Sequence, residues 1–227
     1  MTSFRSGDGG EIRAVFTTQE VEVLKNLTEQ LIELLGDSEL HTSDLDGNQD
    51  PLMNLMGIST SDSPPEDPVL RRLFPDGYQD QEEAAEFRRY TEHGLREKKR
   101  SNAYLIYESI TSAEEENVMQ IEANQFGDSL AEITDHEMKL AIVEILIREI
   151  DANAWLSGLN DLRLALAVRL GIGQRLEPEE NNGETGFELM REGDPMQAVY
   201  AVYSWLGWLQ QSLLEVMMDA GDDHQAT

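Results

Sequence analysis

The chain has 227 residues, no cysteine, and 45 acidic against 17 basic residues, which give a formal net charge of -28. This negative charge is the opposite of what a protein that reads duplex DNA by itself normally carries, because such proteins bind by neutralising phosphates. The lack of cysteine excludes disulfides, thiolate metal sites and thiol redox switches. The opening MTSFRSGDGG lacks the apolar core of a signal peptide, and no apolar run approaches a membrane span. We therefore expect a cytoplasmic protein without membrane contact.

The first predicted elements are a hairpin and a helix. Phe4-Arg5 and the run from Ile12 to Phe16 flank SGDGG, a turn-forming cluster that predicts a short β-hairpin. Thr17 and Glu20 have the spacing of a capping box, and apolar residues then recur at helical spacing as far as Gly36. Residues 37–67 are rich in Ser, Asp and Pro, which predicts a flexible loop.

The middle of the chain is predicted to be helical. After a short helical turn and a Pro-Asp-Gly break, Asp80 with Glu83 begins a helix that can bend at Gly94 and extends to about residue 110. The polar stretch AEEENVMQIEANQFGD follows, and Thr134 with Glu137 then forms a second capping box. The run KLAIVEILI comes next, and its apolar character predicts a buried helix. No strand is expected beyond the hairpin.

Two apolar helices are predicted in the last third of the chain. One contains WLSGLNDLRLALAVRLGI, from Trp155 to Ile172, and the other begins at Asp194-Pro195, where proline follows a capping residue. The predicted fold class is therefore mainly α. We expect one helical domain over 1–218 with a short N-terminal β-hairpin, long acidic loops near 37–67 and 173–193, and a disordered tail at 219–227.

The sequence contains none of the clearest enzyme or metal signatures. The phosphate loop GxxxxGK[ST], the zinc motif HExxH and the nucleophile motif GxSxG are missing, and His136-Glu137 has no second histidine. The stretch DLDGNQD superficially resembles a calcium loop, but it lacks both the glycine at the sixth position and the closing glutamate. No nucleophile is paired with a base. We expect a protein that is not an enzyme and holds no cofactor or metal.

Cations concentrate in one window, RRYTEHGLREKKR. Residues three and four apart share a helix face, so this window can form a basic stripe that contacts a few phosphates or an acidic partner. The candidate contact residues are Arg88, Arg89, Arg96, Lys98, Lys99 and Arg100. The alternative is a solvated surface on which these cations pair with nearby carboxylates, including Glu86, Glu92 and Glu97.

Polar residues also interrupt the apolar helix at Asn160, Asp161 and Arg163. Buried polar groups must be hydrogen-bonded, so we expect these three to join the helix to a neighbour through a polar network, with specific recognition as the alternative. In the last helix, Trp205 and Trp208 are expected to pack in the core with their indole N–H groups bonded. An exposed docking face is the alternative for that pair.

These apolar motifs also carry a family resemblance. The motif residues are Trp155-Leu156, Leu159 to Leu164, Arg169 to Gly171 and Trp205 to Gln210, with LFPDGYQDQEEAAEFRRYTEHGLREKK upstream at Leu73 to Lys99. With these motifs the chain resembles the actinobacterial family of the oxidative-stress regulator AosR, formerly a family of unknown function. The resemblance covers most of the chain outside the two acidic loops.

The resemblance implies a cytoplasmic, non-enzymatic regulator of transcription under oxidative stress. It implies binding to a sigma factor or RNA polymerase, with DNA contacted only weakly or through that partner. The negative charge agrees, because it repels DNA and attracts basic protein surfaces. A non-enzymatic adaptor or structural interaction protein of the same fold is the alternative. Thiol-based sensing does not carry over, since the chain has no cysteine.

Overall fold

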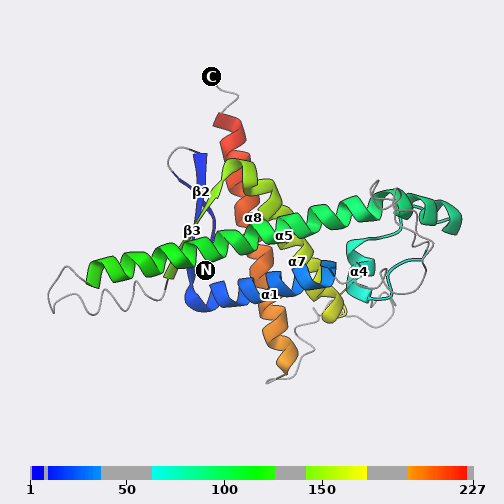
Figure 1. Cartoon of the computed structure of the whole chain (residues 1–227), viewed down its shortest axis with the longest axis horizontal. Coiled ribbons are helices and arrows are strands. Elements are labelled where there is room, and N and C mark those ends of the chain that lie inside the picture. The colour runs from blue at the N-terminus through cyan, green and yellow to red at the C-terminus, as the bar shows by residue number, and fades with distance from the viewer. Residues whose placement is uncertain (1, 8–9, 37–62, 126–141, 173–193, 224–227) are drawn as a thin grey trace, which may run out of the picture. The chain divides into compact units, whose positions relative to one another are not determined.

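The computed structural model describes residues 2–7, 10–36, 63–125, 142–172 and 194–223 (Figure 1). Within these ranges the protein is mainly α, as predicted, and a three-stranded antiparallel sheet has the order β1-β2-β3. The strands are β1 (Arg5–Ser6), β2 (Glu11–Thr17) and β3 (Ile142–Arg148), and a 3-10 turn, η2 (Glu149–Asp151), follows β3. The α-helices are α1 (Thr18–Gly36), α4 (Pro68–Leu73), α5 (Gln81–Gln125), α7 (Ala152–Arg169) and α8 (Pro195–Asp223).

The chain forms two compact units. Unit 1 comprises Met1–Leu31, Asn102–Leu159 and Trp208–Thr227, and unit 2 comprises Ile32–Ser101 and Asn160–Gly207. The helices α1, α5, α7 and α8 each contribute residues to both units. The predicted loops fall largely outside the described residues, whereas α8 continues to Asp223, into the segment 219–227 that we expected to be disordered.

The sheet of unit 1 confirms the predicted hairpin. Arg5 pairs with Arg13 and Ser6 with Ile12, and the Gly7 amide donates to the Glu11 carbonyl at 2.7 Å. On the other side, β2 pairs with β3 in a register that places Ala14 opposite Ile145. One face of the sheet is buried, and its residues are Ile12, Ala14, Phe16, Val143, Ile145 and Ile147.

The prediction of a helix through KLAIVEILI was wrong, because residues 142–148 form β3. Buried and exposed side chains alternate along all seven residues, which is the period of a half-buried strand. Four of the seven are Ile or Val at positions 142, 143, 145 and 147, and β-branched side chains pack well on a pleated surface. The capping box predicted at Thr134 and Glu137 lies outside the described residues.

The core of unit 1 is built around Trp155, which is fully buried. The Phe4 ring contacts it edge-on at 5.9 Å between centroids, and Phe4 also contacts Phe16 at 6.2 Å. Gly158, one helical turn later, allows α7 to approach α5 closely. A Cβ atom there would lie 2.4 Å from Cδ1 of Ile106, so any larger residue requires the Ile106 side chain or one of the two helices to shift.

The N-terminal residues are tied to α8 within unit 1. The Phe4 amide donates to the Ser212 hydroxyl at 3.1 Å, and the Trp208 indole N–H donates to the Thr2 carbonyl at 2.9 Å. The Trp208 ring is nevertheless 41% exposed, and Trp205 is half-buried. The expected bonded indole is therefore present at Trp208, whereas full burial of the pair is not.

Local capping residues begin the helices where the sequence predicted. Glu20 Oε2 accepts from the Thr17 amide at 2.8 Å, while the Glu20 amide donates back to the Thr17 hydroxyl, which completes the capping box of α1. Asp80 and Asp194 accept from the first amides of α5 and α8. The helix α5 extends beyond residue 110, through the polar stretch that was expected to end it, as far as Gln125.

The end of α7 is a Schellman motif. Gly171 has a positive φ of 67°, its amide donates to the Val168 carbonyl, and the Ile172 amide donates to the Ala167 carbonyl. The helix was predicted to be apolar, and its residues Trp155, Leu159, Leu162 and Leu166 are buried. In the part of the chain that the structure describes, no helix is both long and apolar enough to cross a membrane.

Candidate functional site

The cationic window of α5 lies in unit 2, and part of it is turned inward. Arg88 and Arg96 are only 6% and 9% exposed. Glu92 lies between them on the same helical face, with Oε1 2.7 Å from Nη2 of Arg96 and Oε2 3.7 Å from Nε of Arg88. Arg88 also forms an ion pair with Asp76. The spacing of four residues brings these three side chains together along one side of the helix.

Arg96 also serves the C-terminal end of α1. Its Nη1 lies 3.4 Å from the Leu35 carbonyl, and its guanidinium is stacked 4.7 Å above the ring centroid of Phe74. Arg100 is close by, since a Cβ atom at Gly36 would lie 3.8 Å from its Nη2. Helix α1 has no basic residue in its own last turn, and the two arginines supply positive charge where the helix dipole is negative.

The basic stripe predicted from the sequence is therefore divided by the fold. Arg88 and Arg96 hold α5 against its surroundings and are too buried to reach a phosphate on another molecule. Arg89, Lys99 and Arg100 are half-buried, and Lys98 is exposed. The reason is geometric, because neighbouring positions on a helix point in different directions and a run of cations cannot all share one face.

Lys99 contacts one member of the predicted polar network. Its Nζ lies 2.6 Å from Oδ1 of Asp161, which is only 2% exposed on α7. Burial raises the pKa of the Asp161 carboxyl, and the hydrogen bond from Lys99 acts against that rise. The structure thus brings together a residue of the candidate contact group and a residue of the candidate network, which sequence reasoning had treated separately.

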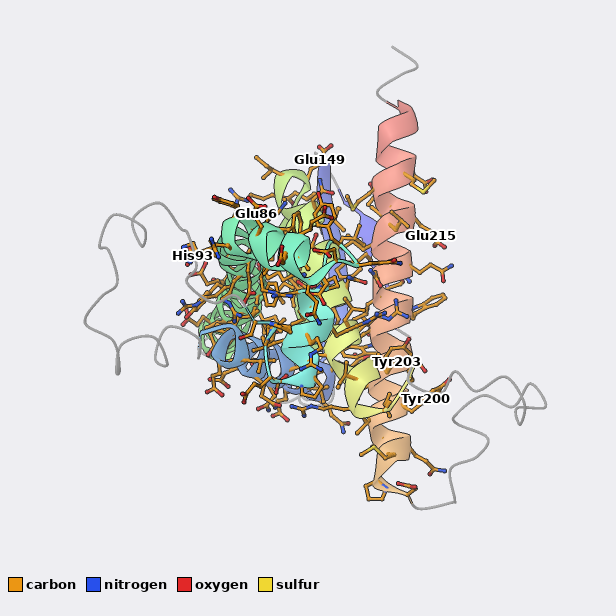
Figure 2. All side chains as sticks on the ribbon, turned by 90° about the vertical axis from the view of Figure 1, so that its right-hand side faces the viewer. Glu86, His93, Glu149, Tyr200, Tyr203 and Glu215 are labelled. Atoms are coloured by element: carbon orange, nitrogen blue, oxygen red, sulfur yellow. The ribbon has the colours of Figure 1, made fainter. Side chains whose placement is uncertain are left out.

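Arg163 has a different set of partners within unit 2. Its Nη2 donates to the Tyr203 hydroxyl at 3.4 Å, and its guanidinium lies 5.1 Å from the centroid of that ring. Gly207, one turn further along α8, leaves room for the group, since a Cβ there would approach it at 3.3 Å. The ring centroids of Tyr200 and Tyr203 are 6.1 Å apart and the two rings are tilted by 42°. Figure 2 shows both side chains on α8.

The three predicted network residues therefore diverge around α7. Asp161 pairs with α5 and Arg163 with α8, while Asn160 is half-buried. Asp161 and Arg163 thus join α7 to two different helices of unit 2. The apolar helix tolerates polar residues because each has a specific partner.

The opposite face of α5 is exposed and aromatic. Tyr90 is 62% exposed and Phe87 38% exposed, and Phe87 stacks edge-on against Tyr78 at 5.7 Å. Gly94 follows Tyr90 by four residues, and a Cβ there would meet nothing within 4 Å. We call Tyr78, Phe87, Tyr90, Gly94 and Lys98 the outer face of α5. The sequence analysis missed this face, although helical spacing relates Phe87, Tyr90, Gly94 and Lys98.

Acidic and polar residues flank one side of the outer face. Glu86, His93 and Glu97 are exposed, and Figure 2 shows Glu86 and His93 projecting outward from α5. An aromatic centre with a charged rim is the usual composition of a protein–protein contact surface. Among the described residues, no three His, Asp or Glu side chains are grouped as metal ligands.

Comparison with known proteins places the chain in a family. The family model described as "Domain of unknown function (DUF2017)" matches residues 1–217. "Oxidative stress regulator AosR" of Mycobacterium tuberculosis is 32% identical over 93% of this chain and 84% of its own length. "Putative oxidative stress regulator AosR" of Mycobacterium leprae is 34% identical over 94% of this chain and 85% of its own length. No solved structure shows significant similarity. The chain therefore belongs to the DUF2017 family, which it shares with relatives named as AosR.

Proposed function

We propose that this protein is a non-enzymatic regulator of the oxidative-stress response that works in the cytoplasm by binding a sigma factor or RNA polymerase. The printed names of its relatives support the stress-response role. The outer face of α5 is the single observation that carries the mechanism, because it combines exposed aromatic side chains with a bare glycine backbone. Exposed aromatic clusters of this kind favour protein partners.

The charge distribution supports a protein partner over direct DNA binding. Arg88 and Arg96 are buried and engaged in ion pairs, so the strongest cationic window of the sequence offers DNA far less charge than its composition suggests. The rest of the chain contributes to a net charge of -28. Such a surface repels phosphate and attracts basic protein patches. DNA binding by the isolated protein is expected to be weak, about 10⁻⁴–10⁻⁶ M.

The ion pair between Glu92 and Arg96 also supports the outer face. Glu92 and Arg96 anchor the opposite side of the same helical segment, and Arg96 is in addition packed on Phe74. A rigid helix presents its exposed side chains at little further entropic cost when a partner binds. The outer face is therefore suited to act as a preformed docking surface.

The test is binding of the purified full chain to RNA polymerase and to individual sigma factors, measured by biolayer interferometry. Tyr90→Ala removes the most exposed aromatic group of the face and should weaken binding by about thirtyfold, the loss typical of an interface anchor. Tyr104→Ala is the matched control, since Tyr104 is 41% exposed on the same helix but lies outside the outer face.

Each outcome bears on a separate part of the proposal. Failure of the unmodified chain to bind any of these proteins would overturn the partner assignment. Binding that is equally strong in Tyr90→Ala would overturn the outer face as the contact surface. Tight, sequence-selective binding to promoter DNA by the isolated chain would overturn the partner-mediated mechanism, and a gel-shift assay at physiological salt measures this directly.

A further inference from the structure

Strand β3 forms an edge of the sheet in unit 1. The sheet order is β1-β2-β3, and among the described residues no further strand pairs with β3 on the side away from β2. The strand is seven residues long and contains no proline, glycine or lysine. Proteins usually protect an exposed edge with proline, with charged side chains of which lysine is the commonest, or with a bulge, because an unprotected edge pairs readily with another strand. The two charged residues of β3, Glu144 and Arg148, have opposite signs, so together they do not repel a second copy of the strand.

The hydrogen-bond register shows which residues of β3 face this edge. The Gly7 amide donates to Glu11, and the backbone groups of an antiparallel strand alternate in direction, so Ile12, Ala14 and Phe16 are turned toward β3. Their partners on β3 are Ile147, Ile145 and Val143. The backbone groups of Glu144, Leu146 and Arg148 consequently point to the outer edge.

The side chains of the same three residues lie on the exposed face of the sheet. Leu146 is 46% exposed, and the Glu144 and Arg148 side chains are 50% and 75% exposed. Along the strand they read acidic, apolar, basic. When this order is turned end for end by a two-fold axis, the acidic end meets the basic end and leucine meets leucine.

We propose that two copies of this chain associate through the outer edges of their β3 strands, antiparallel and centred on Leu146. In this register each Leu146 lies opposite its equivalent, and each Glu144 lies opposite Arg148 of the other copy. Both kinds of cross-strand pair are favourable in antiparallel sheets. The two sheets become one continuous six-stranded sheet, and the contact is isologous, as in most protein dimers.

Shifted registers are less favourable. A shift by one position centres the pairing on Ile145 and places Glu144 opposite Leu146, which loses the opposed charges. A shift in the same direction by a further position centres it on Glu144 and puts two carboxylates together, which is destabilising. The centred register also leaves the buried face apolar, because it sets Ile145 opposite Ile147.

The contacts that the structure describes for Glu144 and Arg148 within each copy do not prevent the pairing. Glu144 lies 3.7 Å from Arg13, and Arg148 lies 2.6 Å from Asp151, but the side chains of Glu144 and Arg148 remain largely exposed. Exposed ion pairs contribute little and rearrange easily. The net charge of -28 on each copy opposes association, so moderate salt should strengthen the dimer by screening that repulsion.

A charge-swap series tests the register, with the dimer dissociation constant of the full chain measured by sedimentation equilibrium at physiological salt. Glu144→Arg and Arg148→Glu each create two like-charge contacts per dimer and should raise the dissociation constant about tenfold or more. The double variant restores both contacts and should return to within about threefold of the unmodified chain. Circular dichroism melting checks that each variant folds.

The rescue by the double variant is diagnostic, because it cannot come from within one copy. There, arginine at position 144 still faces Arg13, and glutamate at 148 still faces Asp151. An unmodified chain that stays monomeric at every concentration would overturn the proposal. A double variant as weak as the single ones would overturn the register.

Cross-linking gives an independent measurement, since the chain has no cysteine of its own. Leu146→Cys places two thiols opposite each other, with Cα atoms about 5.5 Å apart, and a short bis-maleimide should link the copies efficiently. Val15→Cys is the matched control, because Val15 is also 46% exposed on the same face but lies on the central strand β2. Equal cross-linking of both variants would contradict pairing through the β3 edge.

Discussion

Two lysine–carboxylate pairs in different units of the molecule have the same nitrogen–oxygen distance and different surroundings. In both, the lysine Nζ lies 2.6 Å from a carboxylate oxygen. In unit 1 the side chains of Lys25 and Glu114 are 31% and 30% exposed, whereas in unit 2 those of Lys99 and Asp161 are 21% and 3% exposed. The distance alone does not give the contribution of an ion pair to the free energy of unfolding, because that contribution also depends on how much water the two charges lose on burial.

The pKa values of the two pairs respond to different causes. In unit 1 the hydrogen bond to Glu114 raises the pKa of Lys25, so pairing outweighs burial. In unit 2 burial raises the pKa of Asp161, so burial outweighs the hydrogen bond from Lys99. In the first pair the folded protein favours the charged form of Lys25. In the second pair burial disfavours the charged form of Asp161, and the hydrogen bond from Lys99 offsets part of that cost.

The largest expected effect is the removal of Lys99. Lys99→Met leaves Asp161 buried without its cation, and we expect a loss of about 3–5 kcal/mol in the free energy of unfolding. Urea denaturation measures it, with Lys25→Met as the matched change in the exposed pair, where the loss should be only about 0.2–1 kcal/mol. Similar losses in the two variants would show that burial does not separate the pairs.

Replacement of both partners sharpens the same comparison. In Lys99→Met with Asp161→Leu no charge remains buried, and the double variant should lie within about 1 kcal/mol of the unmodified chain or be more stable. Strict addition of the two single losses would contradict a coupled pair.

A smaller loss is expected at Arg163, whose guanidinium stacks on the Tyr203 ring. Arg163→Met removes the stacking on Tyr203 and one long hydrogen bond, and it should cost about 1–2 kcal/mol in the free energy of unfolding. Tyr203→Phe keeps the ring and removes only the hydroxyl, so its loss should be about 0.5 kcal/mol. A larger loss in Tyr203→Phe than in Arg163→Met would show that the Tyr203 hydroxyl, and not the ring, is the main partner of Arg163.

The raised pKa of Asp161 predicts a pH dependence. Because its folded pKa lies above the unfolded value of about 3.9, the folded state holds the proton more tightly and stability falls as pH rises between the two values. Asp161→Asn lacks this titration. The stability of the unmodified chain relative to Asp161→Asn should therefore decline as pH rises through that window. Urea unfolding at several pH values measures this difference in stability. If the difference rose with pH, the hydrogen bond from Lys99 would outweigh burial and the folded pKa of Asp161 would be lowered.

The smallest effect is expected in the exposed pair at high pH. The raised pKa of Lys25 means that its contribution is complete below its ordinary value of 10.5 and is lost as pH rises above that value. Glu114→Gln should remove this dependence at a cost of about 0.2–1 kcal/mol at neutral pH. NMR titration of the Lys25 side chain in both proteins provides the measurement, and an unchanged Lys25 pKa in Glu114→Gln would assign the shift to another group.

Parts of the fold were predictable because they depend on a few neighbouring residues. The capping box at Thr17 and Glu20 and the caps at Asp80 and Asp194 each involve residues at most three positions apart. Strand β3 was not predictable in the same way. Its two charged residues, Glu144 and Arg148, are four apart, which also suits a helix, and only pairing with β2 selects the strand.

The candidate site shows a similar division. The sequence identified the cationic window and the polar residues of α7, but it did not tell which cation pairs with which acid or which of these side chains are buried. Glu92 was named only as one of several acids, although it holds both Arg88 and Arg96. The exposed aromatic face was missed, because aromatic residues at helical spacing are as common in a core as on a surface.

By itself the sequence determined the mainly α class, the starts of α1, α5 and α8, the hairpin and the family resemblance, since these depend on short-range hydrogen bonds and on residue pattern. The tertiary structure alone decided which charges are buried. Lys99 and Asp161 are 62 positions apart, and their contact exists only when α5 and α7 pack together. Burial depends on every segment that removes water from a group, so no local pattern can specify it.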